Sequence, residues 1–262
     1  MQADLSGKVA LVTGSTKDIG NVIALKLAVN GADVVINGRD TGRGLKVVEQ
    51  VKAMGRKAIF EKADIYKYPE VRQMVLNVIG KLGKIDILVA SGGASARPGD
   101  GWVPGHQFFR DIAPERYIDF AMTHWLSRAN CMRAVLDHMI ERQSGRIILI
   151  TADSGRVATP RESMNGAGAA ATMLMARALA SEFTRWGIRV NCLSLTVTET
   201  ESYKEARSTP LGQVLKKIEQ AIPFGITKPE DVAEAALFFA SEESKQITGQ
   251  VLSINGGLSS SG

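Results

Sequence analysis

Apolar residues follow two different patterns along the chain. Seven short runs are apolar nearly throughout, which is typical of parallel β-strands covered on both faces. The longer segments between them have the three-to-four-residue periodicity of amphipathic helices. The predicted strands are Val9–Thr13, Asp33–Ile36, Lys57–Glu61, Ile85–Val89, Arg146–Thr151, Arg189–Leu195 and Gln250–Ile254. The predicted helices include Ile19–Asn30, Arg43–Met54, Val71–Leu82, Ala113–Arg142, Ser163–Trp186 and Pro229–Ala240.

Strands and helices alternate from one end of the chain to the other, and this order predicts the fold. Repeated strand–helix–strand units give a parallel sheet with helices on both faces. No segment has the composition of a linker, so residues 1–262 are predicted to form a single α/β domain. We expect a Rossmann-type, doubly wound sheet of seven parallel strands. The Gly- and Pro-rich segment Gly92–Gly105 follows the fourth strand, on the side where such sheets bind ligands.

Composition and charge exclude several classes of protein. The net charge is only +5 and like charges do not cluster, so nucleic-acid binding is not expected. No uncharged apolar run reaches the ~18 residues of a membrane span, so no membrane association is expected. Cys131 and Cys192 have neither metal-binding nor redox spacing, and Asp4 lies where a secretory signal would be apolar. We therefore expect a cytoplasmic protein without a metal site.

A glycine-containing turn joins the first predicted strand to the first predicted helix. Glycine permits a tight turn and lets a phosphate approach the backbone, while the helix N-terminus offers free N–H groups. The turn therefore predicts a dinucleotide site at this end of the sheet. The turn residues expected to bind the cofactor are Gly14, Ser15, Thr16, Lys17, Ile19 and Gly20.

The end of the second strand bears on which dinucleotide binds. An NAD site usually ends this strand with an acid that holds the ribose 2′-hydroxyl. Here Gly38 leaves space and Arg39 offers a planar cation for a 2′-phosphate, with Lys17 as a second cation. This favours NADP(H) over NAD(H). The alternative is that Arg39 and Lys17 are solvated surface charges.

From Leu5 to Leu258 the chain resembles the short-chain dehydrogenase/reductase family, and within it the 3-oxoacyl-acyl carrier protein reductases. The resemblance implies that Asp64 and Ile65 lie against the adenine and that Ala90 and Gly92 border the cofactor. It also implies tetramers formed through two long helices. The segments that carry it are Asp64-Ile65, Asp86–Val89, Gly145–Ile147, Gly187–Asn191, Pro223–Gly225, Pro229–Ala233, Ile247–Gln250 and Asn255–Gly257.

The resemblance also implies four catalytic positions. The family uses a Tyr as proton donor, a Lys four residues later, a Ser and an Asn. Counting forward from Gly155 and back from Gly187 gives the same assignment. The corresponding residues here are Asn165, Ala169, Ala152 and His124, in that order. None of the four expected groups is present, so the usual proton-coupled hydride transfer is not expected.

The cofactor end departs from the family pattern as well. Asp18 stands where the family has the middle glycine of the turn. Its carboxylate would crowd and repel the pyrophosphate, or would instead cap the following helix. Ala90–Gly93 keeps small residues but lacks the family's amides, and Leu195-Thr196 replaces a Pro-Gly pair. We therefore expect nucleotide binding to be weak or absent.

Other polar residues offer an alternative chemistry. His124, Asp153, Ser154, Glu162 and Asn165 are expected in one pocket, where a His beside an Asp supports non-redox acid–base chemistry such as dehydration or hydrolysis. The alternative is that His124 donates to a backbone carbonyl and that Asp153 is a turn residue.

Three functions remain open. The first is a catalytically silent subunit, in a homo- or hetero-oligomer with family members, formed through the helices Ala113–Arg142 and Ser163–Trp186. The second is an atypical enzyme, either an NADP(H)-dependent oxidoreductase or a lyase or hydrolase that uses His124 and Asp153. The third is a protein that binds the nucleotide as a sensor or is purely structural. The segment Thr198–Ile222 is expected to cover any small-molecule substrate, but it favours no chemical class.

Overall fold

The computed structural model describes residues 3–93, 107–209 and 212–260, and within them seven parallel strands form one sheet. The strand order is β3-β2-β1-β4-β5-β6-β7. This confirms the predicted fold class, and each predicted strand is present with ends that differ by at most two residues. The strands are β1 (Val9–Thr13), β2 (Asp33–Gly38), β3 (Ala58–Lys62), β4 (Ile87–Ala90), β5 (Gly145–Ala152), β6 (Ile188–Leu195) and β7 (Val251–Ile254).

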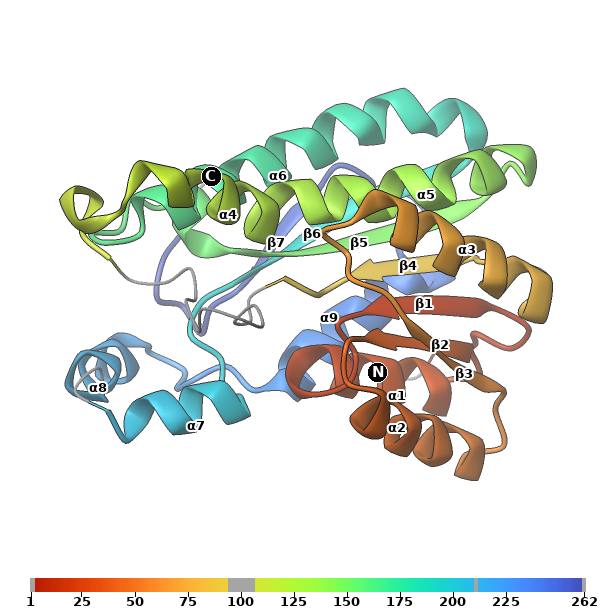
Figure 1. Cartoon of the computed structure of the whole chain (residues 1–262), viewed down its shortest axis with the longest axis horizontal. Helices are drawn as coiled ribbons and strands as arrows, with labels where there is room; N and C mark the ends of the chain where they lie inside the picture. Colours follow the sequence, from red (N-terminus) through yellow and green to blue (C-terminus); the bar gives the residue numbers. More distant parts are fainter. Residues whose placement is uncertain (1–2, 94–106, 210–211, 261–262) are drawn as a thin grey trace.

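Helices cover both faces of this sheet (Figure 1). One face carries α1 (Asp18–Val29), α2 (Thr41–Ala53) and α9 (Pro229–Ala240). The other face carries α3 (Tyr68–Leu82), α5 (Ser127–Glu141) and α6 (Ser163–Phe183). The remaining α-helices of the described residues are α4 (Tyr117–Ala121), α7 (Glu201–Arg207) and α8 (Gly212–Ala221).

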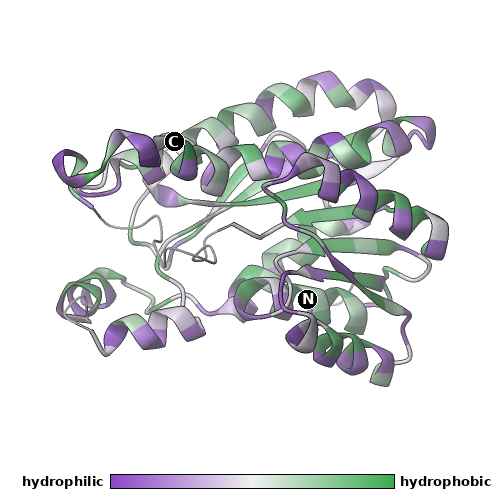
Figure 2. Ribbon diagram, viewed as in Figure 1, coloured by the Kyte–Doolittle hydropathy of each residue, from purple (hydrophilic) through white to green (hydrophobic). Residues whose placement is uncertain are grey.

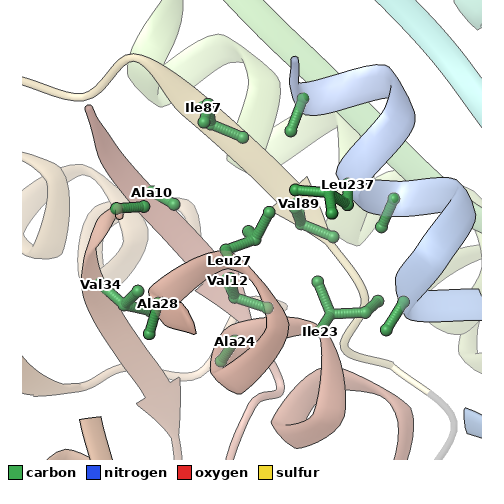
Figure 3. Close-up of a cluster of buried hydrophobic side chains, with 14 of the residues drawn as sticks. Ala10, Val12, Ile23, Ala24, Leu27, Ala28, Val34, Ile87, Val89 and Leu237 are labelled. Carbon is green, nitrogen blue, oxygen red and sulfur yellow. The ribbon is translucent and has the colours of Figure 1, made fainter. Parts of the chain in front are cut away.

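Alternate residues of each strand supply two separate hydrophobic cores. In β1, Ala10 and Val12 point to the layer of α1 and α9, while Val9 and Leu11 belong to the opposite layer. Ala24 and Leu27 of α1 pack with Leu237 of α9 against the first set (Figure 3). The strands are apolar nearly throughout, whereas the helices carry polar residues on their outer sides (Figure 2).

The predicted helix Ala113–Arg142 is not continuous. Its middle, Met122–Leu126, is a π-helical turn that separates α4 from α5, and its first residues form a 3-10 turn at Pro114–Arg116. A π turn widens the helix by one residue, so apolar periodicity alone does not reveal it. Of the predicted loop Gly92–Gly105, only Gly92 and Gly93 lie among the described residues.

Candidate cofactor and active site

A cavity of about 610 Å³ lies beyond the carboxyl ends of β1, β4, β5 and β6. The strand order reverses between β1 and β4, which is the usual ligand position in doubly wound sheets. We call the part formed by Gly14–Gly20 and Gly38–Arg43 the nucleotide end, and the part formed by His124, Arg128 and Ile150–Ala152 the inner end. The predicted cofactor residues that line the cavity are Gly14, Thr16, Lys17, Ile19, Gly20, Arg39, Asp64, Ile65 and Gly92.

Backbone atoms meet closely at the nucleotide end. Gly14 has a φ of +64°, and a Cβ there would lie 2.5 Å from the Cα of Gly92. A Cβ on Gly20 would lie 2.4 Å from the carbonyl oxygen of Gly14. Only glycine fits at these positions, and the turn thereby brings the N-terminus of α1 against the cavity. This cradle suits the phosphates of a dinucleotide.

Two predicted cofactor residues are buried behind the site and do not line it. Ser15 and Ala90 are buried and are not among the residues that line the cavity. The Ser15 hydroxyl donates to the carbonyl oxygen of Val12 at 2.6 Å and accepts from the Asn37 N–H at 3.1 Å. Asn37 in turn accepts from the Gly14 N–H at 3.3 Å through its side-chain oxygen. These bonds fix the turn on the end of β2.

Asp18 was expected either to crowd the pyrophosphate or to cap the helix that follows it, but its carboxylate contacts a distant segment. Its φ is +51°, and its carboxylate accepts from the backbone N–H of Glu201 at 2.7 Å. Lys17 extends this contact, since its ammonium donates to the Ser202 hydroxyl at 3.3 Å. Asp18 therefore caps the first turn of α7 and not its own helix. This contact holds one end of the segment predicted to cover the substrate against the glycine turn.

The residues predicted to bind the adenosine line the same cavity. Arg39 lines the cavity directly after β2, where a 2′-phosphate requires a cation. The space beside Gly38 is filled by Thr16, because a Cβ on Gly38 would lie 2.5 Å from the Thr16 methyl carbon. Asp64 and Ile65 also line the cavity, and Asp64 accepts from the Tyr66 N–H at 3.1 Å.

The four positions assigned from the catalytic residues divide into two groups. His124, in the π-helical turn, and Ala152, at the end of β5, line the cavity. Asn165 and Ala169 are buried in the first turns of α6 and do not line it. A Cβ on Gly168 would lie 2.7 Å from the Cβ of His124, so α6 and the π-helical turn are in close contact.

The π-helical turn frees backbone carbonyls, and side chains satisfy two of them. The Thr172 hydroxyl of α6 donates to the carbonyl oxygen of His124 at 2.5 Å. The Arg128 guanidinium donates to the carbonyl oxygen of Thr123. These bonds stabilise a turn that continuous helical hydrogen bonding would not maintain.

His124 is an electrically neutral group in this fold. Burial first, and then the positive charge of Arg128, lower its pKa to about 4, although the neighbouring Asn165 side chain acts in the opposite direction. Its Nε2 atom is buried and has no hydrogen-bond partner among the described residues. At neutral pH the side chain is therefore a weak base and carries no proton for transfer as an acid.

The expectation that His124 and Asp153 share a pocket is wrong. Asp153 follows β5 but is not among the cavity-lining residues. Its carboxylate accepts from the hydroxyls of Ser194 and Ser253 at 2.5 and 3.0 Å, and from the Asn255 amide at 2.6 Å. These donors lie on β6, on β7 and directly after β7, so the carboxylate is engaged by this edge of the sheet and not by His124. Ser154, Glu162 and Asn165 are also absent from the cavity lining.

Arg128 is a cavity residue that the sequence pattern did not single out. It is 5% exposed, and it lines the inner end of the cavity. A signal was present, because Cys131, Met132 and Val135 follow it by three, four and seven residues and form the buried stripe of α5. A charged residue in register with such a stripe indicates a buried charge.

Metal ligands do not gather anywhere in residues 3–93, 107–209 and 212–260. No three His, Cys, Asp or Glu side chains in these ranges come together as a metal site. None of the helices in this part of the chain has the length and apolar character needed to cross a membrane.

Comparisons with known proteins agree with this geometry. Residues 14–259 match the family model described as enoyl-(acyl carrier protein) reductase. The 3-oxoacyl-[acyl-carrier-protein] reductase FabG of Chlamydia pneumoniae is 30% identical over 259 residues, which cover 98% of this chain and 99% of that protein. A short-chain dehydrogenase/reductase of Armillaria gallica is 30% identical, with 96% of each chain covered.

Solved structures give the same result. The 7α-hydroxysteroid dehydrogenase complexed with NADH and 7-oxo glycochenodeoxycholic acid superposes with a TM-score of 0.88 and 28% identity. The match covers 97% of this chain and 95% of that chain.

Proposed function

The chain belongs to the short-chain dehydrogenase/reductase family, and we propose that it is a non-catalytic member that binds NADP(H) and acts as a subunit beside an active relative. One observation carries the proposal. At the four positions that correspond to the family's catalytic residues, His124, Ala152, Asn165 and Ala169 offer no phenol, hydroxyl or ammonium group.

Reduction of a carbonyl needs both a hydride and a proton. A bound NADPH supplies the hydride, but the proton must come from a group beside the carbonyl oxygen. Ala152 and Ala169 end in methyl groups and Asn165 ends in an amide, so none of them transfers protons. With its pKa at about 4, His124 has no acidic proton at neutral pH. The side chains at these positions therefore support binding without turnover.

The retained nucleotide end supports cofactor binding. The close backbone contacts of Gly14, Gly20 and Gly92 leave space for phosphates against the start of α1. Arg39 lies at the cavity wall after β2 and supports a preference for the 2′-phosphate of NADP(H). Arg43, which pairs with Glu201 at 3.3 Å, adds a third cation to this region beside Arg39 and Lys17.

Exposed apolar side chains support a role as a subunit. Ile118, Trp125 and Leu174 are 58, 37 and 67% exposed on α4, the π-helical turn and α6. Because isolated chains seldom leave several large apolar groups in water on neighbouring elements, we propose that this face pairs with another family member in a tetramer.

The test is a titration of the purified chain with NADPH and NADH, followed by turnover assays with 3-oxoacyl thioesters and by native mass spectrometry. We expect the purified chain to bind NADPH and to show no turnover above background. We expect turnover only in complexes that the chain forms with a related, active subunit. Carbonyl reduction by the isolated chain at ordinary enzymatic rates would overturn the proposal.

Replacement of Arg39 tests the cofactor preference. We expect Arg39→Leu to weaken NADPH binding about 10- to 100-fold and to leave NADH binding nearly unchanged, because a charge-assisted bond to a phosphate contributes about 1.5–3 kcal/mol. Arg133→Leu is the matched control, since Arg133 is exposed on α5, pairs with Asp137 and does not line the cavity. Equal losses for both nucleotides in Arg39→Leu would contradict the assignment.

A further inference from the structure

Arg128 places a positive charge deep in the molecule, at the inner end of the cavity. Its guanidinium donates through Nε and Nη2 to the carbonyl oxygen of Ile150, at 3.2 and 3.1 Å. Through Nη1 it donates to the carbonyl oxygen of Thr123 and to the Ser127 hydroxyl. Four of its five N–H groups are thus engaged, and one on Nη2 is left for another acceptor.

All of these acceptors are neutral. Within residues 3–93, 107–209 and 212–260, no Asp or Glu forms an ion pair with Arg128. Burial lowers the pKa of Arg128, and the groups that raise it are the Tyr66 phenol and the thiols of Cys131 and Cys192, not carboxylates. A buried charge without a counter-charge is strongly unfavourable, which distinguishes Arg128 from a structural ion pair. Arg146 provides the contrast, because it is also buried but pairs with Glu242.

Two further polar groups at the inner end have no partner among the described residues. The Thr151 hydroxyl and the His124 Nε2 atom are buried without a hydrogen bond there, and both residues line the same cavity as Arg128. A hydroxyl always carries a proton that it can donate, and a neutral imidazole donates from one of its two nitrogens. The described part of the inner end therefore combines one cation with two neutral donor groups and no acid.

We infer that the inner end of this cavity binds the carboxylate of a small organic ligand, with Arg128 as its counter-charge and Thr151 and His124 as neutral partners. A single negative charge matches the single guanidinium, whereas a phosphate dianion would leave one charge uncompensated in a buried site. The nucleotide phosphates belong to the opposite end of the cavity, at Gly14–Gly20. Carboxylate binding at the inner end requires no catalysis, and it is expected of the nucleotide-free chain.

The test measures binding of acetate, succinate and benzoate to the nucleotide-free full chain, each against its amide, by calorimetry in low-chloride buffer. We expect at least one carboxylate to bind ten or more times tighter than its amide. Phenyl phosphate is the second arm, and we expect it to bind more weakly than benzoate. Absence of any carboxylate preference, or tighter binding of phenyl phosphate, would overturn the inference.

Variants locate the site. We expect Arg128→Met to reduce the carboxylate affinity at least tenfold and Thr151→Val to reduce it about threefold. Arg128→Lys should retain part of the affinity. Arg146→Met is the matched control, because it removes a buried arginine whose charge Glu242 already balances. The assignment would be refuted if all three variants fold and bind the carboxylate as tightly as the unsubstituted chain. If Arg128→Met does not fold, Thr151→Val and the carboxylate–amide comparison still decide the question.

Discussion

The two ends of the cavity are built from different parts of the polypeptide. At the nucleotide end the decisive contacts join backbone atoms, with Gly14 against Gly92 and Gly20 against the carbonyl of Gly14. At the inner end the decisive features are side chains, chiefly the neutral imidazole of His124 and the charge of Arg128, which no carboxylate of the described residues balances. The first kind of contact follows from the fold. The second depends on the identity of single residues.

This difference determines which parts of the cavity can be inferred from similarity to relatives. This chain, which is 30% identical to FabG of Chlamydia pneumoniae, has the doubly wound strand order and keeps Gly14 and Gly20 of the turn, with Asp18 between them. The groups that transfer protons are side chains, and one substitution each is enough to replace them. The family therefore predicts the nucleotide end better than the inner end.

The largest effect is expected from a substitution that disrupts the backbone contact between Gly14 and Gly92. Gly14→Ala places a methyl group 2.5 Å from the Cα of Gly92, at a φ of +64°. We expect the free energy of unfolding to fall by about 4 kcal/mol, from backbone strain and overlap together, and NADPH binding to be lost. Urea denaturation and nucleotide titration measure the two effects.

Gly55→Ala is the control for strain without overlap. Gly55 has a φ of +76°, and a Cβ on this residue would meet no atom within 4 Å. We expect a loss of about 1 kcal/mol and unchanged nucleotide binding. Equal losses in Gly14→Ala and Gly55→Ala would mean that the Gly14–Gly92 contact is unimportant.

The second-largest expected effect concerns the inner end of the cavity and depends on pH. The pKa of His124 is lowered from 6.5 to about 4 in the folded protein, so the unfolded chain binds a proton first as the pH falls. This contribution to stability is therefore present above pH 6.5 and is lost progressively between pH 6.5 and 4. At about 1.4 kcal/mol per pH unit, the loss reaches about 3 kcal/mol.

Urea unfolding at several pH values, with His124→Asn as comparison, measures this contribution. We expect the stability difference between the two proteins to shift in favour of His124→Asn as the pH falls. His138→Asn is the comparison for a less buried imidazole: burial also lowers the pKa of His138, so we expect a smaller shift in the same direction. An identical pH dependence in wild type and His124→Asn would contradict the burial of a neutral imidazole.

The smallest effect lies where the glycine turn meets α7. Asp18→Asn removes a negative charge beside the expected phosphate position but keeps an acceptor for the Glu201 N–H. We expect NADPH to bind about fivefold tighter. Asp18→Gly removes the acceptor too, so we expect the same gain together with faster proteolysis near α7. A weaker affinity in both variants would show that the carboxylate does not oppose the phosphate.

Much of the fold could be predicted from sequence because apolar periodicity reports burial directly. All seven strands follow from that pattern, whereas the strand order that places the switch point between β1 and β4 comes from the structure. Nine of the eleven residues predicted to bind the cofactor line the cavity, since glycine spacing constrains a turn. Ser15 and Ala90 were the exceptions, since both are buried and do not line the cavity. Sequence does not reveal that the Ser15 hydroxyl is used by Val12 and Asn37.

The inner end was harder to predict because its properties arise between distant segments. The Asp18–Glu201 contact, at the opposite end, likewise joins residues that are 183 positions apart. Asp153 was expected beside His124, but Ser194, Ser253 and Asn255 engage its carboxylate. The π-helical turn and the burial of Arg128 depend on packing that no local pattern contains in full.

The contact between Gly14 and Gly92 has a consequence for how such a chain diverges. A Cβ on Gly14 would lie 2.5 Å from the Cα of Gly92, so Gly14 cannot change while the backbone stays in place. A Cβ on Gly92 would lie 2.8 Å from the end of the Ile65 side chain, so a change there requires Ile65 to move. Ala152 and Ala169 are different, because exchanging one side chain for another at such positions leaves the backbone contacts of the turn unchanged. Over evolutionary time, a lineage can therefore give up a reaction in a few substitutions and still inherit the nucleotide fold almost unchanged.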